Sequence, residues 1–158
     1  MIRIGHSWDT HMLIKDRKLI LGGIEIESEL GLLGHSDADV VLHAVAESLL
    51  GSLALGDLGT FFPDNSSKTL NMDSKIILKE CYKKVLDKGF KLVNLDLMIY
   101  SEVIKINPHR LKIQESIAKL LDTDISNISI KATTYERMGF IGRGEAIACE
   151  CVCLVSND

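Results

Sequence analysis

The 158-residue chain is poor in proline, with only two, and it contains no serine- or glycine-rich stretch. It also lacks the roughly eighteen consecutive apolar residues that a membrane-spanning helix needs. Without a linker-like segment the chain offers no domain boundary, so we expect a single domain over residues 1–158. Hydrophobic residues make up 46% of the chain, which is enough to build a sizeable core.

The sequence also shows no basic stripe and, at its amino terminus, no pattern typical of a signal peptide. No run of lysine and arginine stands out to neutralise a nucleic-acid backbone, and the formal net charge is −4. The amino terminus has no apolar signal-peptide core. We therefore expect a cytoplasmic protein that binds neither membranes nor nucleic acid, although a bound divalent cation could still attract a small anion.

Cysteine is scarce, and its spacing is unlike that of zinc-binding hairpins. Cys81 stands alone, whereas Cys149, Cys151 and Cys153 alternate along a predicted strand. Alternation places these three side chains in a row on one face, where free cysteines behave as small hydrophobic residues. We interpret all four as reduced core residues, as expected in a reducing compartment.

Hydrophobic periodicity predicts a mixture of strands and helices. We expect strands at residues 1–9, 18–28, 90–103, 127–136 and 145–155, and helices at residues 37–55, 72–89 and 107–121. Ser36 or Asp37 should cap the first helix, Gly89 should end the second, and Asn107 with Pro108 should begin the third. Gly22-Gly23 marks a bend or bulge within the second strand. The order predicts an α/β (α+β) domain with one mixed β-sheet and helices packed on one face.

Histidines and aspartates concentrate near the amino terminus. "GHSWDTH" (residues 5–11) and "GHSDADVVLHA" (residues 34–44) hold four of the five histidines. Asp9 and His11 share one face of an extended segment, and His43 lies in a helix on the flank of an apolar stripe. Two histidines and a carboxylate suit a tetrahedral Zn²⁺ whose fourth position stays open, as in catalytic sites. The alternative is a solvated Asp9 and a half-buried structural His43.

Other polar residues suggest phosphate chemistry. His35 precedes the first predicted helix, where it could face an anion at the helix N-terminus, whereas Asp37 and Asp39 are better explained as capping residues. "ATTYE" (residues 132–136) ends a strand with Glu136, a candidate ligand for Mg²⁺, which prefers oxygen. For its threonines, the alternative to a functional role is simple strand propensity. No cysteine or serine has an evident neighbouring base, so the pattern favours metals holding phosphates over covalent catalysis.

These motifs occur in the same order in a known enzyme family. The stretches concerned are "RIGHSWDTH", "ILGGIEI", "GLLGHSDADVVLHAVAESLLG", "ALGDLGTFFPD" and "IKATTYERMGFIGRGEAIAC", from Arg3 to Cys149. Over this length the chain resembles the 2-C-methyl-D-erythritol 2,4-cyclodiphosphate synthases of the non-mevalonate isoprenoid pathway. The resemblance implies a phosphorus–oxygen lyase that converts 4-diphosphocytidyl-2-C-methyl-D-erythritol 2-phosphate into the cyclic diphosphate, with release of CMP. It also implies a homotrimer whose active sites lie between subunits.

By matching position, the resemblance implies a role for each candidate residue. Asp9, His11 and His43 would hold Zn²⁺ or another divalent transition metal. Glu136 would hold Mg²⁺ or Mn²⁺ at the diphosphate. The catalytic residues would be His35 and Thr134, which would stabilise the transition state.

The resemblance further implies an extended substrate-binding surface in several groups. Beside the zinc ligands lie Thr10, His35 and Ser36. The methylerythritol and its phosphate would be covered by Asp57, Leu58, Gly59, Phe62, Pro63, Asp64, Asn65 and Ser66. The cytidine pocket would consist of Ser101, Glu102, Val103, Ile104, Lys105, Ile106, Asn107 and Thr133. Further substrate contacts would come from Thr134, Tyr135 and Glu136. A central cavity that can hold a prenyl diphosphate would be lined by Phe140, Arg143 and Glu145, and Phe140 and Arg143 are also counted among the substrate-binding residues.

Two positions depart from the family pattern. Ser7 stands where a glycine is common, and Ile104 stands where a proline is usual, which leaves the shape of the cytidine pocket open. Two other functions fit the metal motif: a zinc phosphohydrolase or phosphodiesterase, and a non-catalytic module that binds a metal or nucleotide. Thr133, Thr134 and Glu136 favour catalysis, because a storage site has no use for hydroxyls directed at phosphate.

Overall fold

The structure is a computed structural model that describes residues 1–63, 65 and 70–158. Its strands are β1 (Ile2–Lys15), β2 (Leu19–Leu21), β3 (Ile24–Ile26), β4 (Leu30–Leu32), β5 (Lys91–Tyr100), β6 (Ile128–Thr133) and β7 (Ala146–Ser156). Its helices are α1 (Val40–Ser52), α2 (Leu58–Phe61), α3 (Ser74–Asp87), α4 (Arg110–Leu120) and α5 (Gly139–Gly142), with short 3₁₀ turns at Asn107–His109 and Ile125–Asn127.

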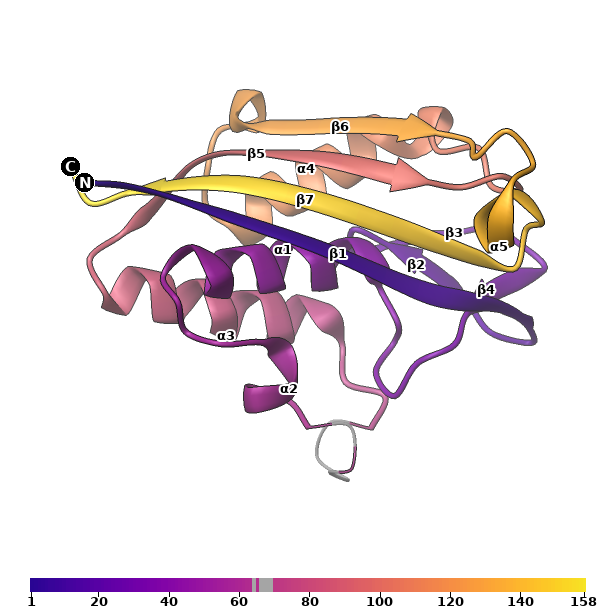
Figure 1. The fold of residues 1–158 in the computed structure, drawn as a ribbon, viewed down its shortest axis with the longest axis horizontal. Coiled ribbons are helices and arrows are strands. Elements are labelled where there is room, and N and C mark those ends of the chain that lie inside the picture. The colour runs from indigo at the N-terminus through magenta and orange to yellow at the C-terminus, as the bar shows by residue number, and fades with distance from the viewer. Residues whose placement is uncertain (64, 66–69) are drawn as a thin grey trace.

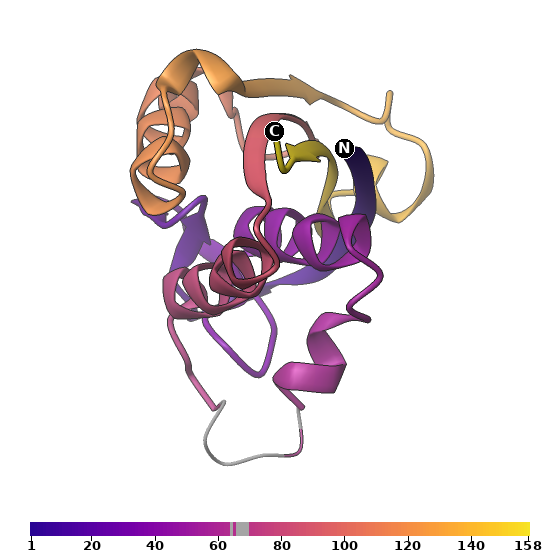
Figure 2. The same cartoon turned by 90° about the vertical axis from the view of Figure 1, so that its left-hand side faces the viewer.

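The main sheet has five strands in the order β4-β1-β7-β5-β6. β7 pairs antiparallel with both β1 and β5, whereas β5 and β6 run parallel, so the sheet is mixed as predicted. Figures 1 and 2 both show α1 and α3 below this sheet, with α1 directly against β1 and β7. The chain therefore has the predicted α+β architecture.

A second, two-stranded sheet was not predicted. β2 and β3 pair antiparallel around Gly22-Gly23, in the segment where we expected one continuous strand with a bend. Both glycines have positive φ, 62° and 77°, and two consecutive residues in this region reverse the chain in a tight hairpin. The glycine pair therefore ends one strand and begins another.

The first helix begins later than predicted, because its N-cap is Asp39 and not Ser36 or Asp37. The buried carboxylate of Asp39 accepts hydrogen bonds from the N–H groups of Val41 and Leu42 in α1, and from those of Gly22 and Gly23 in the hairpin. Burial raises the pKa of Asp39 to about 6, although three of these donors oppose that shift. Since Asp39 occupies the first N–H groups of α1, an anion-facing role for His35 cannot depend on an open helix terminus.

Two further helix boundaries test the capping predictions. Gly89 follows the end of α3 with a φ of 78°, as predicted for a residue just beyond a helix. The Asn107 prediction is wrong: Asn107–His109 forms a 3₁₀ turn, and α4 begins at Arg110 without a side-chain cap. Pro108 fits this turn because a missing N–H costs nothing at the start of a helix.

The cysteines all lie in the core, as predicted. Cys81, Cys149, Cys151 and Cys153 are free thiols and are buried. Burial raises the pKa of Cys149 well above its ordinary value, so this thiol stays protonated and inert. The row on β7 packs against α1, where Cys151 lies 3.2 Å from the hydroxyl of Ser48.

The face of the sheet opposite α1 carries large apolar side chains that are exposed in the single chain. They alternate along β1 and continue on β7, and they are Ile2, Ile4, Trp8, Met12 and Val152. Polar groups on the same face bond to one another, since Glu150 accepts from Tyr100 at 2.7 Å and lies 2.8 Å from His6. An apolar face of this kind is typical of a surface that contacts another chain. Within residues 1–63, 65 and 70–158, no helix is long and apolar enough to cross a membrane.

Candidate metal centre and substrate site

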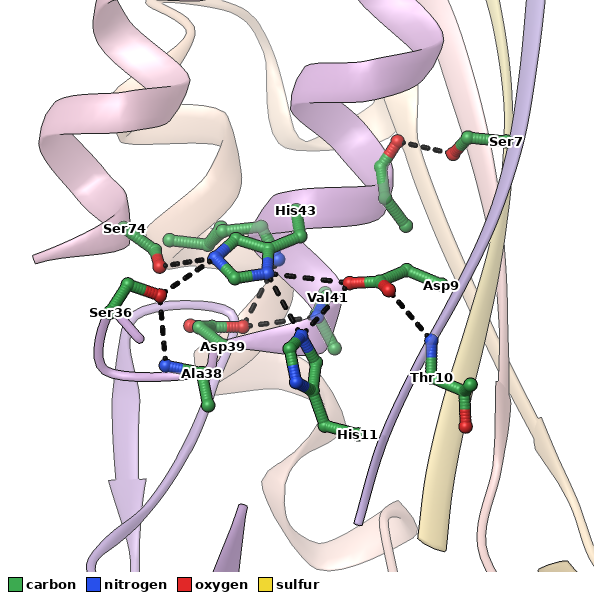
Figure 3. A network of polar contacts seen from close by, with 12 residues as sticks. Ser7, Asp9, Thr10, His11, Ser36, Ala38, Asp39, Val41, His43 and Ser74 are labelled. Carbon is green, nitrogen blue, oxygen red and sulfur yellow. Dashed lines mark hydrogen bonds and ion pairs between the residues drawn. The ribbon is translucent and has the colours of Figure 1, made fainter. Parts of the chain in front are cut away.

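Close packing of α1 on β1 brings the predicted metal ligands together. A Cβ atom on Gly5 would lie 1.8 Å from the carbonyl oxygen of Ser48, so only glycine allows the helix to approach the strand this closely. Next along the strand, Ser7 donates a hydrogen bond of 2.6 Å to the carbonyl of Ala44. Asp9 and His11 follow on the same face and meet His43 of α1 (Figure 3).

The three donor atoms form a nearly equilateral triangle. Asp9 Oδ2 lies 3.1 Å from His11 Nε2 and 3.3 Å from His43 Nδ1, and the two nitrogens are 3.1 Å apart. A tetrahedral zinc site with bonds of about 2.0–2.1 Å has ligand atoms roughly 3.3–3.4 Å apart. The donor set and its spacing therefore fit three corners of a zinc tetrahedron.

Hydrogen bonds at the far side of each ring hold the histidines in place. His11 Nδ1 lies 2.8 Å from the carbonyl oxygen of Leu33, which can only accept. His43 Nε2 lies 3.1 Å from the hydroxyl of Ser36 and 2.9 Å from that of Ser74. Such contacts fix the tautomer and ring orientation of metal-binding histidines.

The three groups of the triad interact electrostatically with one another. Burial alone would raise the pKa of Asp9, but hydrogen bonds from His11 and His43, together with their charges, hold it well below its usual range. For His11, burial lowers the pKa, but the hydrogen bond and charge of Asp9 outweigh it and raise the net value. A divalent cation would replace the histidine protons that pair with this carboxylate.

A cavity of about 340 Å³ opens beside the triad. Its lining consists of Asp9, His11, His35, Ser36, His43, Glu47, Leu58, Phe62 and Ile77. Of the predicted substrate residues, His35, Ser36, Leu58 and Phe62 therefore lie here. Thr10 does not line the cavity, and its hydroxyl donates to the carbonyl of Ile147 at 3.3 Å.

Only some of the residues predicted to bind substrate from the loop after α1 lie at this cavity. Asp57 caps α2 by accepting from the N–H of Thr60 at 2.8 Å, so it organises the loop from outside the cavity lining. Gly59, Pro63 and Asn65 are described but do not line the cavity. Asp64 and Ser66 lie outside the described residues.

Glu47 is a cavity residue that the sequence reasoning missed. It follows His43 by four positions, so both side chains leave the same face of α1, and this spacing was the available signal. Burial raises the pKa of Glu47, and the charges of Asp57 and Asp9 raise it further. The carboxylate thus adds a second acidic group beside the triad.

A second cavity, of about 400 Å³, gathers most of the residues predicted to bind cytidine. It is lined by Ser101, Glu102, Ile104, Lys105, Ile106, Asn107, Pro108, Ala132, Thr133 and Thr134. Val103 is the exception, since its side chain points to Gly144, where a Cβ atom would lie 2.7 Å from Val103 Cγ1. The N–H of Ile104, which a proline would lack, donates to Ser101 Oγ at 3.1 Å and restrains the loop in another way.

Thr134 and Glu136 belong to this second region and not to the metal cavity. The hydroxyl of Thr134 donates to Glu136 Oε1 at 3.3 Å, and Tyr135 N–H donates to Glu102 at 3.1 Å. Glu136 has a φ of 49°, a left-handed conformation that turns its carboxylate out of the strand direction. The two cavities share no lining residue. One chain therefore places the Asp9–His11–His43 triad and the Thr134–Glu136 pair in separate sites.

Comparison with known proteins explains why these motifs occur together. The model of the YgbB family matches residues 2–156. The chain belongs to the YgbB family.

Named relatives of this YgbB chain confirm the resemblance inferred from its motifs. The 2-C-methyl-D-erythritol 2,4-cyclodiphosphate synthase of Carboxydothermus hydrogenoformans is 52% identical over 157 residues, 99% of this chain and 96% of that protein. The structure of IspF from Plasmodium falciparum in complex with CDP has 34% identity and a TM-score of 0.85, and the match covers 98% of this chain and 95% of that one. The bifunctional IspDF of Campylobacter jejuni is 37% identical with a TM-score of 0.95, but the match spans only 42% of that longer chain.

Proposed function

We propose that this chain is a cyclodiphosphate synthase. It converts 4-diphosphocytidyl-2-C-methyl-D-erythritol 2-phosphate into 2-C-methyl-D-erythritol 2,4-cyclodiphosphate and releases CMP, a step in isoprenoid precursor biosynthesis. The observation that carries the proposal is the Asp9–His11–His43 triad, which opens onto a cavity in a chain that matches the synthases over 99% of its length. The CDP complex of the Plasmodium falciparum relative supports a substrate linked to cytidine diphosphate.

Two metal ions fit the proposed reaction. Asp9, His11 and His43 would hold Zn²⁺, and Glu136 would hold Mg²⁺, which takes oxygen ligands and keeps much of its water. When bound, these ions would supply positive charge that offsets the repulsion between two phosphate groups and aligns them for displacement.

The protein's own residues position the substrate. The substrate's 2-phosphate is already anionic and attacks within the same molecule, so the reaction needs alignment more than a protein base. His35 and Ser36 line the metal cavity and would contact the phosphate there, while Leu58 and Phe62 would cover the methylerythritol. The hydroxyl of Thr134, with Thr133 and the 101–107 loop, would hold the diphosphate and cytidine.

We further propose that the working form is a homotrimer with each active site shared between two subunits. The separation of the two cavities supports this, because neither cavity alone contains both the triad and the Thr134–Glu136 pair. The exposed apolar face of β1 and β7 supports it as well, since a second and third copy could cover that face. Phe140 and Arg143, which the resemblance places at a central cavity between subunits, are exposed in the single chain. Arg143 already pairs with Glu145 at 2.7 Å, so a prenyl diphosphate bound there would compete with Glu145 for the Arg143 guanidinium.

The reaction product provides the direct test of this function. We expect phosphorus NMR of the purified protein with the cytidyl substrate, Zn²⁺ and Mg²⁺ to show CMP and a cyclic diphosphate in equal amounts. Inorganic phosphate would instead indicate a phosphohydrolase. No turnover at all would indicate a metal-binding or nucleotide-binding module.

Glu136→Gln tests the division between the two metal sites. The amide keeps the shape of the side chain but removes the charge that attracts a hard cation. We expect turnover to fall by about a hundredfold or more, and the Mg²⁺ concentration for half-maximal rate to rise, while zinc content stays unchanged. CDP binding should weaken more than CMP binding, because only CDP offers a diphosphate to the ion. Loss of zinc with an unchanged Mg²⁺ dependence would contradict the assignment.

A further inference from the structure

We propose that Ser74 and Asp37 are positioning residues for the metal centre and act through His43. This inference rests on the proposed zinc site. Neither residue was expected from the sequence to serve the metal, and Asp37 was expected only to cap a helix. Ser74 is fully buried at the start of α3, and Figure 3 shows its hydroxyl on the side of the His43 ring that faces away from Asp9.

The contacts form a chain of three groups. His43 Nε2 lies 2.9 Å from Ser74 Oγ, and Ser74 Oγ in turn bonds closely to Asp37 Oδ1. The second oxygen of the carboxylate, Asp37 Oδ2, accepts the backbone N–H of Ser74 at 3.1 Å. Both oxygens of Asp37 are therefore directed at the same residue.

This arrangement fixes the direction of each hydrogen bond that links Asp37, Ser74 and His43. A carboxylate can only accept, so the single hydroxyl hydrogen of Ser74 goes to Asp37. The Ser74 oxygen must then accept from His43, which places a hydrogen on Nε2. In the neutral ring, Nδ1, the nitrogen nearest Asp9, is then left with the lone pair that a metal ion requires, and the hydrogen through which it can pair with Asp9 is the one that the ion replaces. Ser74 and Asp37 thus select the metal-binding tautomer of His43.

The same contacts join two loops at the metal cavity. Asp37 N–H donates to the carbonyl of Met72 at 3.1 Å, and Asn71 N–H donates to the carbonyl of His35 at 2.7 Å. The segment that leads into α3 is therefore paired with the segment that carries His35 and Ser36. We infer that this pairing holds His35 and the His43 ring in one fixed relation.

Ser36 offers a second acceptor and must be included in the test. Its hydroxyl lies 3.1 Å from His43 Nε2, but it also accepts the N–H of Ala38 at 3.1 Å. We expect Ser74→Ala to lower zinc affinity about tenfold, and the double variant Ser36→Ala/Ser74→Ala to lower it about a hundredfold. Competition with a chromophoric chelator measures both values. The absorption of the Co²⁺-substituted protein should change as well, because the ring orientation changes.

Ser48→Ala is the matched control. Ser48 is also fully buried and hydrogen-bonded, but it contacts Val45 and Cys151, away from the metal ligands. Its loss should lower the melting temperature to a degree comparable with Ser74→Ala and leave zinc affinity and the Co²⁺ spectrum unchanged. Equal zinc losses in Ser48→Ala and Ser74→Ala would overturn the proposal, as would wild-type zinc affinity in Ser74→Ala.

Asp37→Asn tests the proton direction itself. If the new NH₂ group takes the place of Oδ2, it faces the N–H of Ser74 and that bond is lost. If it takes the place of Oδ1, it can only donate to Ser74 Oγ, so the hydroxyl hydrogen turns to His43 Nε2 and the ring hydrogen moves to Nδ1. We expect weaker zinc binding in this nearly isosteric variant, and unchanged affinity would refute the tautomer argument. These outcomes are separate from a failure of the proposed function, which would appear as a wild-type chain without tight zinc or without cyclic product.

Discussion

His43→Ala should lose bound zinc and cyclodiphosphate synthesis together, while the chain still folds. The substitution removes one corner of the donor triangle, whose atoms lie 3.1–3.3 Å apart, and leaves two ligands that cannot close a tetrahedral site. Removing one group that stabilises developing charge costs about a hundredfold to a thousandfold in rate, and loss of the ion should cost at least that much.

Folding should survive because the core does not depend on the metal. α1 is anchored by its buried aliphatic residues and by Asp39, and His43 lies at the edge of that packing. We expect a loss of roughly 1 kcal/mol in the free energy of unfolding. The measurements are elemental analysis, circular dichroism and the rate of CMP release.

His109→Ala is the control for the His43 variant. His109 ends the 3₁₀ turn before α4 and is not part of the donor cluster, so its zinc content and activity should match the wild type. A folded His43→Ala protein that retained its full complement of zinc would refute the metal assignment. An unfolded one would show that the metal site and the core are not independent.

Mixed oligomers should recover activity from two nearly inactive chains. If each active site takes the zinc triad from one subunit and Thr134 from a neighbour, His43→Ala and Thr134→Ala damage opposite halves of the site. Random assembly of equal amounts leaves about one quarter of the sites with both halves intact, since each half is intact with a probability of about one half. We therefore expect about a quarter of wild-type activity after joint refolding.

The controls for this experiment are each variant refolded alone and the two variants mixed without refolding. Both should remain nearly inactive, because subunits that do not exchange cannot form a mixed site. Sedimentation or light scattering would establish the number of subunits in the same samples. Joint refolding that yields no more activity than either parent would mean that each site lies within one subunit.

Much of the fold could be predicted because local patterns decide it. The strand β7 and the helix α3 follow from periodicity and from Gly89, features that depend on residues within a turn or two. Contacts with residues elsewhere in the chain could not be predicted in this way. Asp39 was interpreted as a capping residue and is the N-cap of α1, but the hydrogen bonds that it also accepts from Gly22 and Gly23 of the hairpin follow from no local rule.

The sequence by itself determined which residues could bind a metal and that Asp9 and His11 would face the same way, since side chains alternate along a strand. It could not place His43, which is 32 residues beyond His11, within 3.1 Å of it. Only the packing of α1 on β1 across Gly5 decided that distance. Ser74 was recognisable as a site residue only in three dimensions, and so was the separation of the two cavities. Periodicity is encoded by near neighbours, whereas a site forms where distant segments pack, and the volumes and hydrogen bonds of the whole core decide that packing.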